Sequence, residues 1–190
     1  TASGCEVSKA HTEVRCTTAA GYGSSLQWRV TVGAQTSAPS TDTTSYMVPV
    51  IDSVTGPGSF RANTDGGQIV LIAGSQFGPK YASGEYDHVV VTYGPTGHEY
   101  TAASCRVSAS HVQLECVTVP GTGKDHSWLV QIGDQTSALF GAMTSYSPPI
   151  VAYYLGAGST NADTEGGQTV TVMGANFGKD DSKLDRVTYS

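Results

Sequence analysis

The stretch "CRVSASHVQLEC", residues 105–116, places a cysteine at each end and alternates apolar with polar residues in between. The chain carries a close relative of this stretch one hundred positions earlier, "CEVSKAHTEVRC" at residues 5–16. Alternation with a period of two is typical of a β-strand that buries one face. Each stretch is therefore predicted to form a β-hairpin whose two strands begin and end at cysteine.

The antiparallel register follows when Cys105 is placed opposite Cys116, because directly opposed residues lie close enough for a disulfide. The remaining predicted pairs are Val107 with Leu114 and Ala109 with Val112, with Ser110 and His111 as a two-residue turn. The earlier hairpin pairs Cys5 with Cys16 and Val7 with Val14 in the same way. Closing such a short loop contributes roughly 3 kcal/mol to stability in the chain-entropy model.

Alternatives to disulfides are four free buried cysteines or a zinc site, and the zinc site is disfavoured because no short CxxC spacing occurs. Disulfides imply an oxidising compartment, so we expect an extracellular or cell-surface location. His11 and His111 fall at the two turns, where histidine is one of the residues that tolerate a positive φ. We therefore interpret both histidines as turn residues.

The repeat extends well beyond the hairpins. Sliding the chain by one hundred positions gives 33 identities over residues 1–78, after which the frame shifts by four so that "VTY" at 91–93 matches "VTY" at 187–189. The stretches "PVIDSVTGPGS" and "PIVAYYLGAGS" have the proline, short apolar strand and turn expected at the start of a domain. We expect one complete domain at 48–147, the C-terminal half of a preceding domain at 1–47, and the N-terminal half of a following domain at 148–190.

Short alternating segments separated by glycine predict the fold class. In "WLVQI", for example, Trp128, Val130 and Ile132 share one face. No segment has a helical period over three turns, and many short strands at intervals of about ten residues are typical of an antiparallel β-sandwich. The prediction is an all-β chain.

Two further blocks, "TDGGQIVLIAGSQFG" at 64–78 and "TEGGQTVTVMGANFG" at 164–178, carry a resemblance to a known family. Together with the paired cysteines, "VPGTG" and "WLVQIGDQTS", they resemble the IPT/TIG immunoglobulin-like domain over essentially the whole chain. The resemblance implies seven-stranded sandwiches, here in tandem, of a kind found in receptors, Rel-type transcription factors, some bacterial enzymes and long surface arrays of protists. It implies no catalytic residue, and the basic DNA-contacting loops of the transcription-factor branch have no counterpart here.

Composition narrows the range of functions. The net charge is −6, charged residues make up 14%, and Ser and Thr together number 44. Nothing in this pattern attracts nucleic acid or an anionic membrane, and no apolar run reaches the roughly 18 residues that span a bilayer. No GxSxG, HExxH, P-loop or GxGxxG motif is present, so we expect neither an enzyme nor a cofactor.

Three sets of residues are weaker candidates for sites. Asp180 and Asp181 are the best candidates for calcium between domains, although solvated turn carboxylates are commoner. The Ser/Thr/Pro-rich runs are candidates for O-linked sugars, or else ordinary strand and linker, at Ser40, Thr41, Thr43, Thr44, Thr144, Ser145 and Ser147. Apolar residues on outward positions form a candidate inter-subunit patch, or simple drift between repeats, at Ile69, Leu71, Leu139 and Phe140.

Half a sandwich exposes a core face and open strand edges, so the two end segments need partners. The expected partners are adjacent repeats of the same chain or further copies of it, arranged head to tail, with glycans as additional ligands. The function predicted first is therefore a structural protein of an extracellular filament or cell-surface appendage. The alternatives are a surface adhesion or receptor ectodomain, and an accessory module of a secreted carbohydrate-active enzyme.

Overall fold

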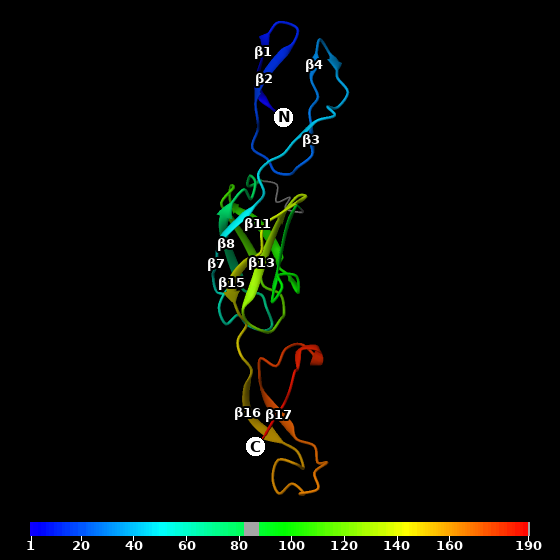
Figure 1. Cartoon of the computed structure of the whole chain (residues 1–190). Helices are drawn as coiled ribbons and strands as arrows, with labels where there is room; N and C mark the ends of the chain where they lie inside the picture. Colours follow the sequence, from blue (N-terminus) through cyan, green and yellow to red (C-terminus); the bar gives the residue numbers. More distant parts are fainter. Residues whose placement is uncertain (82–87, 190) are drawn as a thin grey trace.

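The computed structural model describes residues 1–81 and 88–189, and the fold is all-β, as predicted. Three parts follow one another along the long axis of the molecule (Figure 1). We call them the first segment (1–47), the central sandwich (48–147) and the third segment (148–189). Among the described residues the only helical element is a short 3-10 turn, η1 (Asp181–Lys183).

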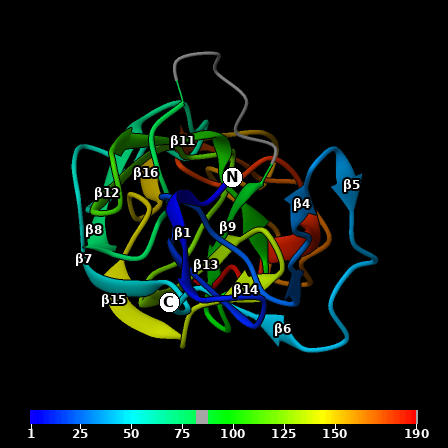
Figure 2. The same cartoon turned by 90° about the horizontal axis from the view of Figure 1, so that it is seen from above.

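The central sandwich consists of two antiparallel sheets packed face to face. One sheet has the order β11-β12-β8-β7, and the other has the order β10-β9-β13-β14 with β15 also paired to β13. Viewed down the long axis, β7, β8 and β12 lie to one side of β9, β13 and β14 (Figure 2). The strands are β7 (Val50–Thr55), β8 (Ile69–Ser75), β9 (Val89–Gly94), β10 (Tyr100–Thr101), β11 (Ala103–Ala109), β12 (Gln113–Val117), β13 (His126–Ile132), β14 (Gln135–Thr136) and β15 (Phe140–Thr144).

The core lies between these sheets and is filled by the residues that alternation predicts. Trp128, Val130 and Ile132 on β13 are all at most 1% exposed. The Trp128 indole stacks on the ring of Tyr93 from β9, with 4.4 Å between centroids and 10° between planes. The indole N–H donates to the hydroxyl of Thr144 on β15 at 2.8 Å, so the largest core side chain leaves no polar atom unsatisfied.

Both predicted disulfides, Cys5–Cys16 and Cys105–Cys116, are present, each with 4.1 Å between the Cα atoms. The predicted pairing of Val107 with Leu114 is correct, but that of Ala109 with Val112 is wrong, because Ala109 pairs with Gln113 across a bulge. Val112 lies in the turn and donates its N–H to the Ala109 carbonyl at 3.2 Å.

The bulge belongs to the hairpin itself, because the first hairpin has it too: Lys9 pairs with Glu13, and the Thr12 N–H donates to the Lys9 carbonyl at 3.1 Å. The turn of the second hairpin also docks on a neighbouring loop. The His111 N–H donates to the Gly78 carbonyl at 2.7 Å, and the Phe77 N–H donates to the His111 carbonyl at 3.2 Å. His111 has a φ of 70° and His11 a φ of 63°, so the prediction of turn residues with positive φ is confirmed. Docking on residues 77–78 therefore holds a turn that the first hairpin forms without these bonds.

The first and third segments each contain an intact hairpin but only fragments of other strands. In the first segment β1 pairs with β2, β3 with β6, and β4 with β5; in the third, β16 pairs with β17. The strands are β1 (Ser3–Lys9), β2 (Glu13–Thr17), β3 (Leu26–Gln27), β4 (Thr31–Val32), β5 (Gln35–Thr36), β6 (Thr43–Thr44), β16 (Ile150–Leu155) and β17 (Thr171–Ala175). The long strand β13 thus corresponds to two short pieces in the first segment.

Candidate assembly interface

The first segment exposes the apolar face that its counterpart in the central sandwich buries. Trp28 is 37% exposed and Val30 is 45% exposed, whereas Trp128 and Val130 are buried. On the first hairpin, Val7 is 66% exposed where Val107 is fully buried. The counterparts of these exposed side chains belong to one core cluster, so together they mark a surface to be covered.

The third segment shows the complementary half of the same pattern. Phe177 is 39% exposed, while its counterpart Phe77 is fully buried. Tyr189 is fully exposed, while its counterpart Tyr93 is the ring stacked on Trp128. Each outer segment therefore presents one side of a core that the central sandwich shows closed.

A tyrosine holds the first segment against the central sandwich. The Tyr22 ring stacks on the His88 ring with 4.2 Å between centroids and 6° between planes. A Cβ on Gly78 would lie 3.3 Å from the Tyr22 ring, and a Cβ on Gly133 would lie 3.0 Å from it. The absence of side chains at these two glycines therefore provides space for the ring. Both glycines also have positive φ, which independently favours glycine there.

Polar contacts reinforce this junction. The Ser24 N–H donates to Asp134 Oδ1 at 2.9 Å, and the Ser24 hydroxyl donates to Asp134 Oδ2. These two bonds lower the pKa of Asp134, because they stabilise the charged carboxylate. The Gln135 side-chain amide donates to the Tyr46 carbonyl at 2.9 Å.

No repeat in the sequence predicts this junction, because the residues that make its main contacts differ between the units. Tyr22 corresponds to Thr122, Ser24 to Lys124, and Asp134 to Ala34. Gly78 does recur, since Gly178 meets Thr122 at the next junction as Gly78 meets Tyr22, and so do Gln135 and Tyr46. A periodicity search therefore contains no signal for the pair of rings.

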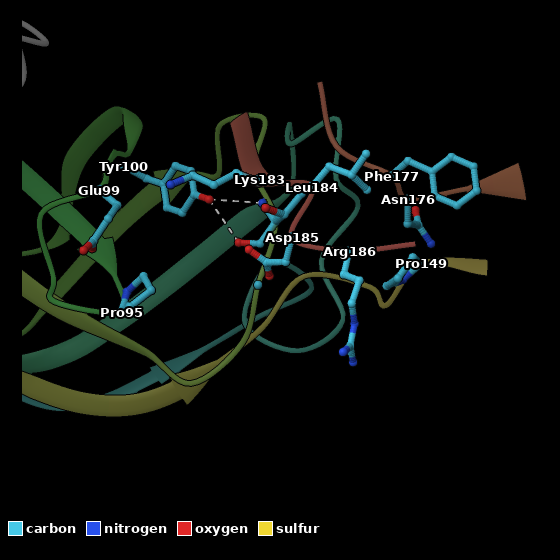
Figure 3. Close-up of a pocket in the computed structure, with 12 residues that line it drawn as sticks. Pro95, Glu99, Tyr100, Pro149, Asn176, Phe177, Lys183, Leu184, Asp185 and Arg186 are labelled. Carbon is cyan, nitrogen blue, oxygen red and sulfur yellow. Dashed lines mark hydrogen bonds between the residues drawn. The ribbon is translucent and has the colours of Figure 1, made fainter. Parts of the chain in front are cut away.

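The second junction encloses a cleft of about 400 Å³. Tyr100 and Glu99 line it from the central sandwich, and the run 183–186 lines it from the third segment (Figure 3). The Tyr100 hydroxyl is bonded to the backbone of Thr122, donating to its carbonyl at 3.0 Å and accepting from its N–H at 3.2 Å. The side chain and backbone of Thr96 hold the pKa of Glu99 at about 2, so this wall of the cleft stays negatively charged.

His126 is a titratable side chain buried inside the central sandwich. It is 1% exposed and is edge-on to the rings of Tyr93, Tyr100 and Tyr146, with centroids 5.7–6.1 Å away. Neither ring nitrogen has a hydrogen-bonding partner of normal geometry among the described residues. Burial lowers its pKa, and Glu99 and Asp125 oppose that effect only in part.

The structure rejects one of the predicted O-glycosylation positions and restricts others. Thr144 is 3% exposed and its hydroxyl accepts from Trp128, so it is not available to a sugar. Ser145 and Ser147 are half-buried and their hydroxyls bond to the backbone of Arg61.

In the first segment, Thr44 accepts from the Trp28 indole at 3.0 Å, as Thr144 does from Trp128. Ser40 accepts from the Trp28 N–H at 2.9 Å and donates to the Asp42 carbonyl at 2.6 Å. Thr41 and Thr43 have exposed side chains. Glycosylation at these two remains a prediction.

The four residues of the predicted inter-subunit patch do not form one surface. Ile69 and Leu71 alternate with buried Val70 and Ile72 on β8, so they point away from the core as predicted. Leu139 precedes β15 of the other sheet, lies against Gly97 and is 55% exposed. Phe140, instead of pointing outwards, packs against the core. The single patch was therefore a wrong prediction, because the sequence does not reveal which sheet each strand joins.

The calcium candidates are placed at a turn. Asp180 caps η1, and its carboxylate accepts from the Ser182 N–H at 3.0 Å. Hydrogen bonding from the Ser182 side chain, and then from its backbone N–H, lowers the pKa of Asp180. Within residues 1–81 and 88–189, no group of three or more His, Cys, Asp or Glu side chains has an arrangement able to hold a metal ion. The same residues contain no helix with the length and hydropathy needed to cross a membrane.

Comparison with known families agrees with this geometry. The family model described as IPT/TIG domain matches residues 49–148, the span of the central sandwich. The chain belongs to the IPT/TIG domain family. IPT/TIG domains occur as immunoglobulin-like modules in cell-surface and extracellular proteins, and the two disulfides fit that setting. A comparison with curated proteins gives no match for this IPT/TIG chain.

Proposed function

We propose that this IPT/TIG chain is a structural element of an extracellular filament or cell-surface appendage, in which immunoglobulin-like units follow one another head to tail. The observation that carries the proposal is the pair of open core faces, one at each end of a closed sandwich. Trp28 and Phe177 are the clearest examples, because each is exposed at a position that the central sandwich buries. Because each open core face needs another half-sandwich to cover it, the chain is suited to a continuous series of immunoglobulin-like units.

The first junction supports a mechanical role. Stacking of Tyr22 on His88 and the bonds from Ser24 to Asp134 restrict how one unit turns on the next. Pro49 is buried beside this junction and Pro148 and Pro149 begin the next link, so neither link is a flexible spacer. The role requires no catalytic group.

Electron microscopy of the native material tests the proposal. We expect linear arrays with a regular axial repeat, because successive units share the same fold and a repeat of close to one hundred residues. Isolated particles without axial order, in preparations where the polypeptide is identified by mass spectrometry, would rule out the structural array.

The second candidate is a surface adhesion or receptor ectodomain, and the cleft at the second junction favours it. Tyr100 offers an aromatic face there, while Lys183 and Arg186 offer donors to a polar ligand such as a glycan (Figure 3). Binding of the chain to a glycan array would support the adhesion hypothesis. This binding should be lost in Lys183→Ala and Arg186→Ala but retained in Lys124→Ala. Lys124 is a matched control because its side chain is exposed and outside the cleft.

A further inference from the structure

His126 begins strand β13 and lies in a cage of three tyrosine rings inside the central sandwich. The rings are those of Tyr93 on β9, Tyr100 on β10, and Tyr146, which follows β15. The imidazole is 1% exposed, and among the described residues neither of its nitrogens has a hydrogen-bonding partner of normal geometry. Burying polar nitrogens without partners costs stability, so the position is unusual for a side chain that only fills the core.

The same three tyrosines hold the connection between β12 and β13. We call this connection the β12–β13 loop (residues 118–125). The Tyr146 hydroxyl donates to the Val119 carbonyl at 2.6 Å, and the Val119 N–H donates to the Tyr93 hydroxyl at 3.1 Å. The Tyr100 hydroxyl is bonded to both the carbonyl and the N–H of Thr122. The rings that enclose the imidazole are therefore also the anchors of the loop.

The loop backbone lies directly against two of these rings. A Cβ on Gly123 would lie 3.2 Å from His126 Cε1, and a Cβ on Gly121 would lie 2.7 Å from the Tyr146 ring. Contacts this close leave no room for the rings to shift while the loop stays in place. A displacement of the imidazole or of the tyrosine therefore moves the loop.

Protonation of His126 places a positive charge among groups that do not neutralise it. Burial raises the pKa of Tyr93 and of Tyr146, so both hydroxyls stay neutral in the pH range where histidine titrates. The Tyr100 hydroxyl is already bonded to the backbone of the loop. A counter-charge must therefore come from outside the cage.

Two carboxylates outside the cage act on His126, but neither is bonded to it. Glu99, which precedes β10, accepts from the N–H and the hydroxyl of Thr96. Asp125, which precedes His126, forms an ion pair with Lys124 at 3.6 Å. Burial lowers the pKa of His126, and the two carboxylates oppose this only in part. The charged imidazole is therefore disfavoured as long as the cage stays closed.

Backbone carbonyls of the loop are the acceptors available to a protonated ring. The backbone of Thr122 and Gly123 favours the charged form of His126. Both carbonyls already accept a bond, from the Tyr100 hydroxyl at 3.0 Å and from the Tyr146 N–H at 2.9 Å, respectively. A protonated imidazole therefore competes with the bonds that hold the loop in place.

The loop also contacts the third segment. A Cβ on Gly178 would lie 2.9 Å from Thr122 Cγ2, so the two residues are closely packed. The Gly121 N–H donates to the Thr64 carbonyl at 3.0 Å. The Thr64 hydroxyl in turn donates to Asn176 Oδ1 at 3.3 Å. A movement of the loop is thus transmitted to the second junction by two routes.

We propose that His126 is an acid-sensitive switch, whose protonation releases the β12–β13 loop from its tyrosines and loosens the second junction. The switch does not recur in the first segment, because Leu26 stands at the corresponding position there. It is independent of the proposed structural function, since it requires only the central sandwich and its contact with the third segment.

Amide exchange at Thr122 tests the release, because its N–H is bonded to the Tyr100 hydroxyl. Once corrected for the intrinsic effect of pH on exchange, protection at Thr122 should fall by up to about tenfold per pH unit below about pH 6.5. Protection should stay constant in His126→Leu and should fall as before in His98→Leu, whose side chain is exposed. Protection that does not change with pH, or that falls equally in His126→Leu, would overturn the switch.

Denaturant dependence separates release of the loop from unfolding of the whole sandwich. The Ser137 N–H, which donates to the Val130 carbonyl at 2.8 Å, provides the reference amide. Low concentrations of denaturant should accelerate exchange at Thr122 much less than at Ser137, because a local opening exposes little surface. Equal acceleration at the two amides would show that only global unfolding occurs, and would overturn the switch.

Tyr100→Phe tests the competition for the Thr122 carbonyl while the imidazole is kept. Without the competing hydroxyl, His126 should take up its proton at a higher pH, which NMR titration of the ring measures. The matched control is Tyr22→Phe, which removes a hydroxyl at the other junction and should leave the titration unchanged. A His126 titration that is the same in Tyr100→Phe as in the unsubstituted chain would contradict this mechanism.

Small-angle scattering of the whole chain tests the effect on the second junction. The spread of angles between the central sandwich and the third segment should be wider at about pH 5 than at about pH 7, and should not widen in His126→Leu. A spread that is unchanged by pH would overturn the coupling of the loop to the junction. Periodic arrays in native material, the test of the structural function, would stand in either case.

Discussion

Trp28 and Trp128 occupy equivalent positions and make the same indole hydrogen bond to a threonine, yet one is 37% exposed and the other 1%. The hydrogen bond survives in the first segment because both of its partners belong to the same half-sandwich. Burial does not survive, because it depends on strand β9 from the other half. The indole hydrogen bond is therefore encoded within one half-sandwich, whereas burial of the tryptophan requires both halves.

The substitution with the largest expected effect is Trp128→Ala. Removing a fully buried indole and its stacking on Tyr93 should lower the free energy of unfolding of the central sandwich by about 3–5 kcal/mol. Trp28→Ala, the matched control, should change that transition by no more than about 0.5 kcal/mol, because Trp28 lies outside the central core. Chemical denaturation measures both, and equal losses would show that the first segment shares the core of the central sandwich.

The two disulfides provide a second test of whether the first segment and the central sandwich are independent. Replacing Cys105 and Cys116 together by serine should cost the central sandwich about 3 kcal/mol, because a short loop in the unfolded chain is no longer closed. The same replacement at Cys5 and Cys16 should leave that transition in place and loosen only the first hairpin, seen as faster amide exchange over residues 3–17. A central transition that responds equally to both pairs would contradict the independence of the segments.

His126 corresponds to Leu26 in the first segment, and this difference predicts a pH dependence. Burial lowers the pKa of His126 in the folded state, so the unfolded state takes up a proton first as the pH falls. Stability is therefore fully present above the ordinary pKa of about 6.5 and is lost below it, by at most about 1.4 kcal/mol per pH unit.

His126→Leu, which copies the first segment, should flatten this part of the profile. Thermal unfolding between about pH 7 and pH 5 is the measurement. His98→Leu is the control, because His98 is exposed on the same sandwich. An unchanged slope in His126→Leu would assign the acid sensitivity to another group.

The smallest expected effect on stability comes from the junction. Tyr22→Ala removes the ring that stacks on His88, and we expect the angle between the first segment and the central sandwich to vary more widely, with little change in unfolding. Small-angle scattering of the monomeric chain measures this spread. Thr122→Ala at the second junction is the matched control, and an equal effect there would mean that the ring stacking adds no stiffness.

Sequence alone predicted the features that are local or periodic. Alternation identified the buried face of β13 through Trp128 and Val130, and the cysteine spacing identified both disulfides. Features that depend on distant segments were missed or wrong. Thr144, for example, is buried because β15 packs its hydroxyl against an indole 16 residues away. The bulge that sets Gln113 opposite Ala109 is local and recurs in the first hairpin, but the alternation of apolar and polar residues does not reveal it.

The candidate interface shows the same division. The exposed faces of the outer segments follow from the repeat, since each position has a buried counterpart. The stacking of Tyr22 on His88 does not follow, because it joins positions 66 residues apart that differ between repeats. Patterns within one strand can thus be predicted from the sequence, whereas contacts between sheets and between units cannot.

Both cysteines of each hairpin lie in the same half of a sandwich, so no disulfide crosses from one half to the other. Under tension applied to its two ends, a unit of this kind yields along its strand ladders while the hairpin loop stays locked. The cysteines are 11 positions apart, so the locked loop withholds about 35 Å of contour length from a stretched unit. Reduction should lengthen the unfolding step in a single-molecule pulling trace by that amount, which makes the redox state of the surroundings a control on how far the chain extends before it breaks.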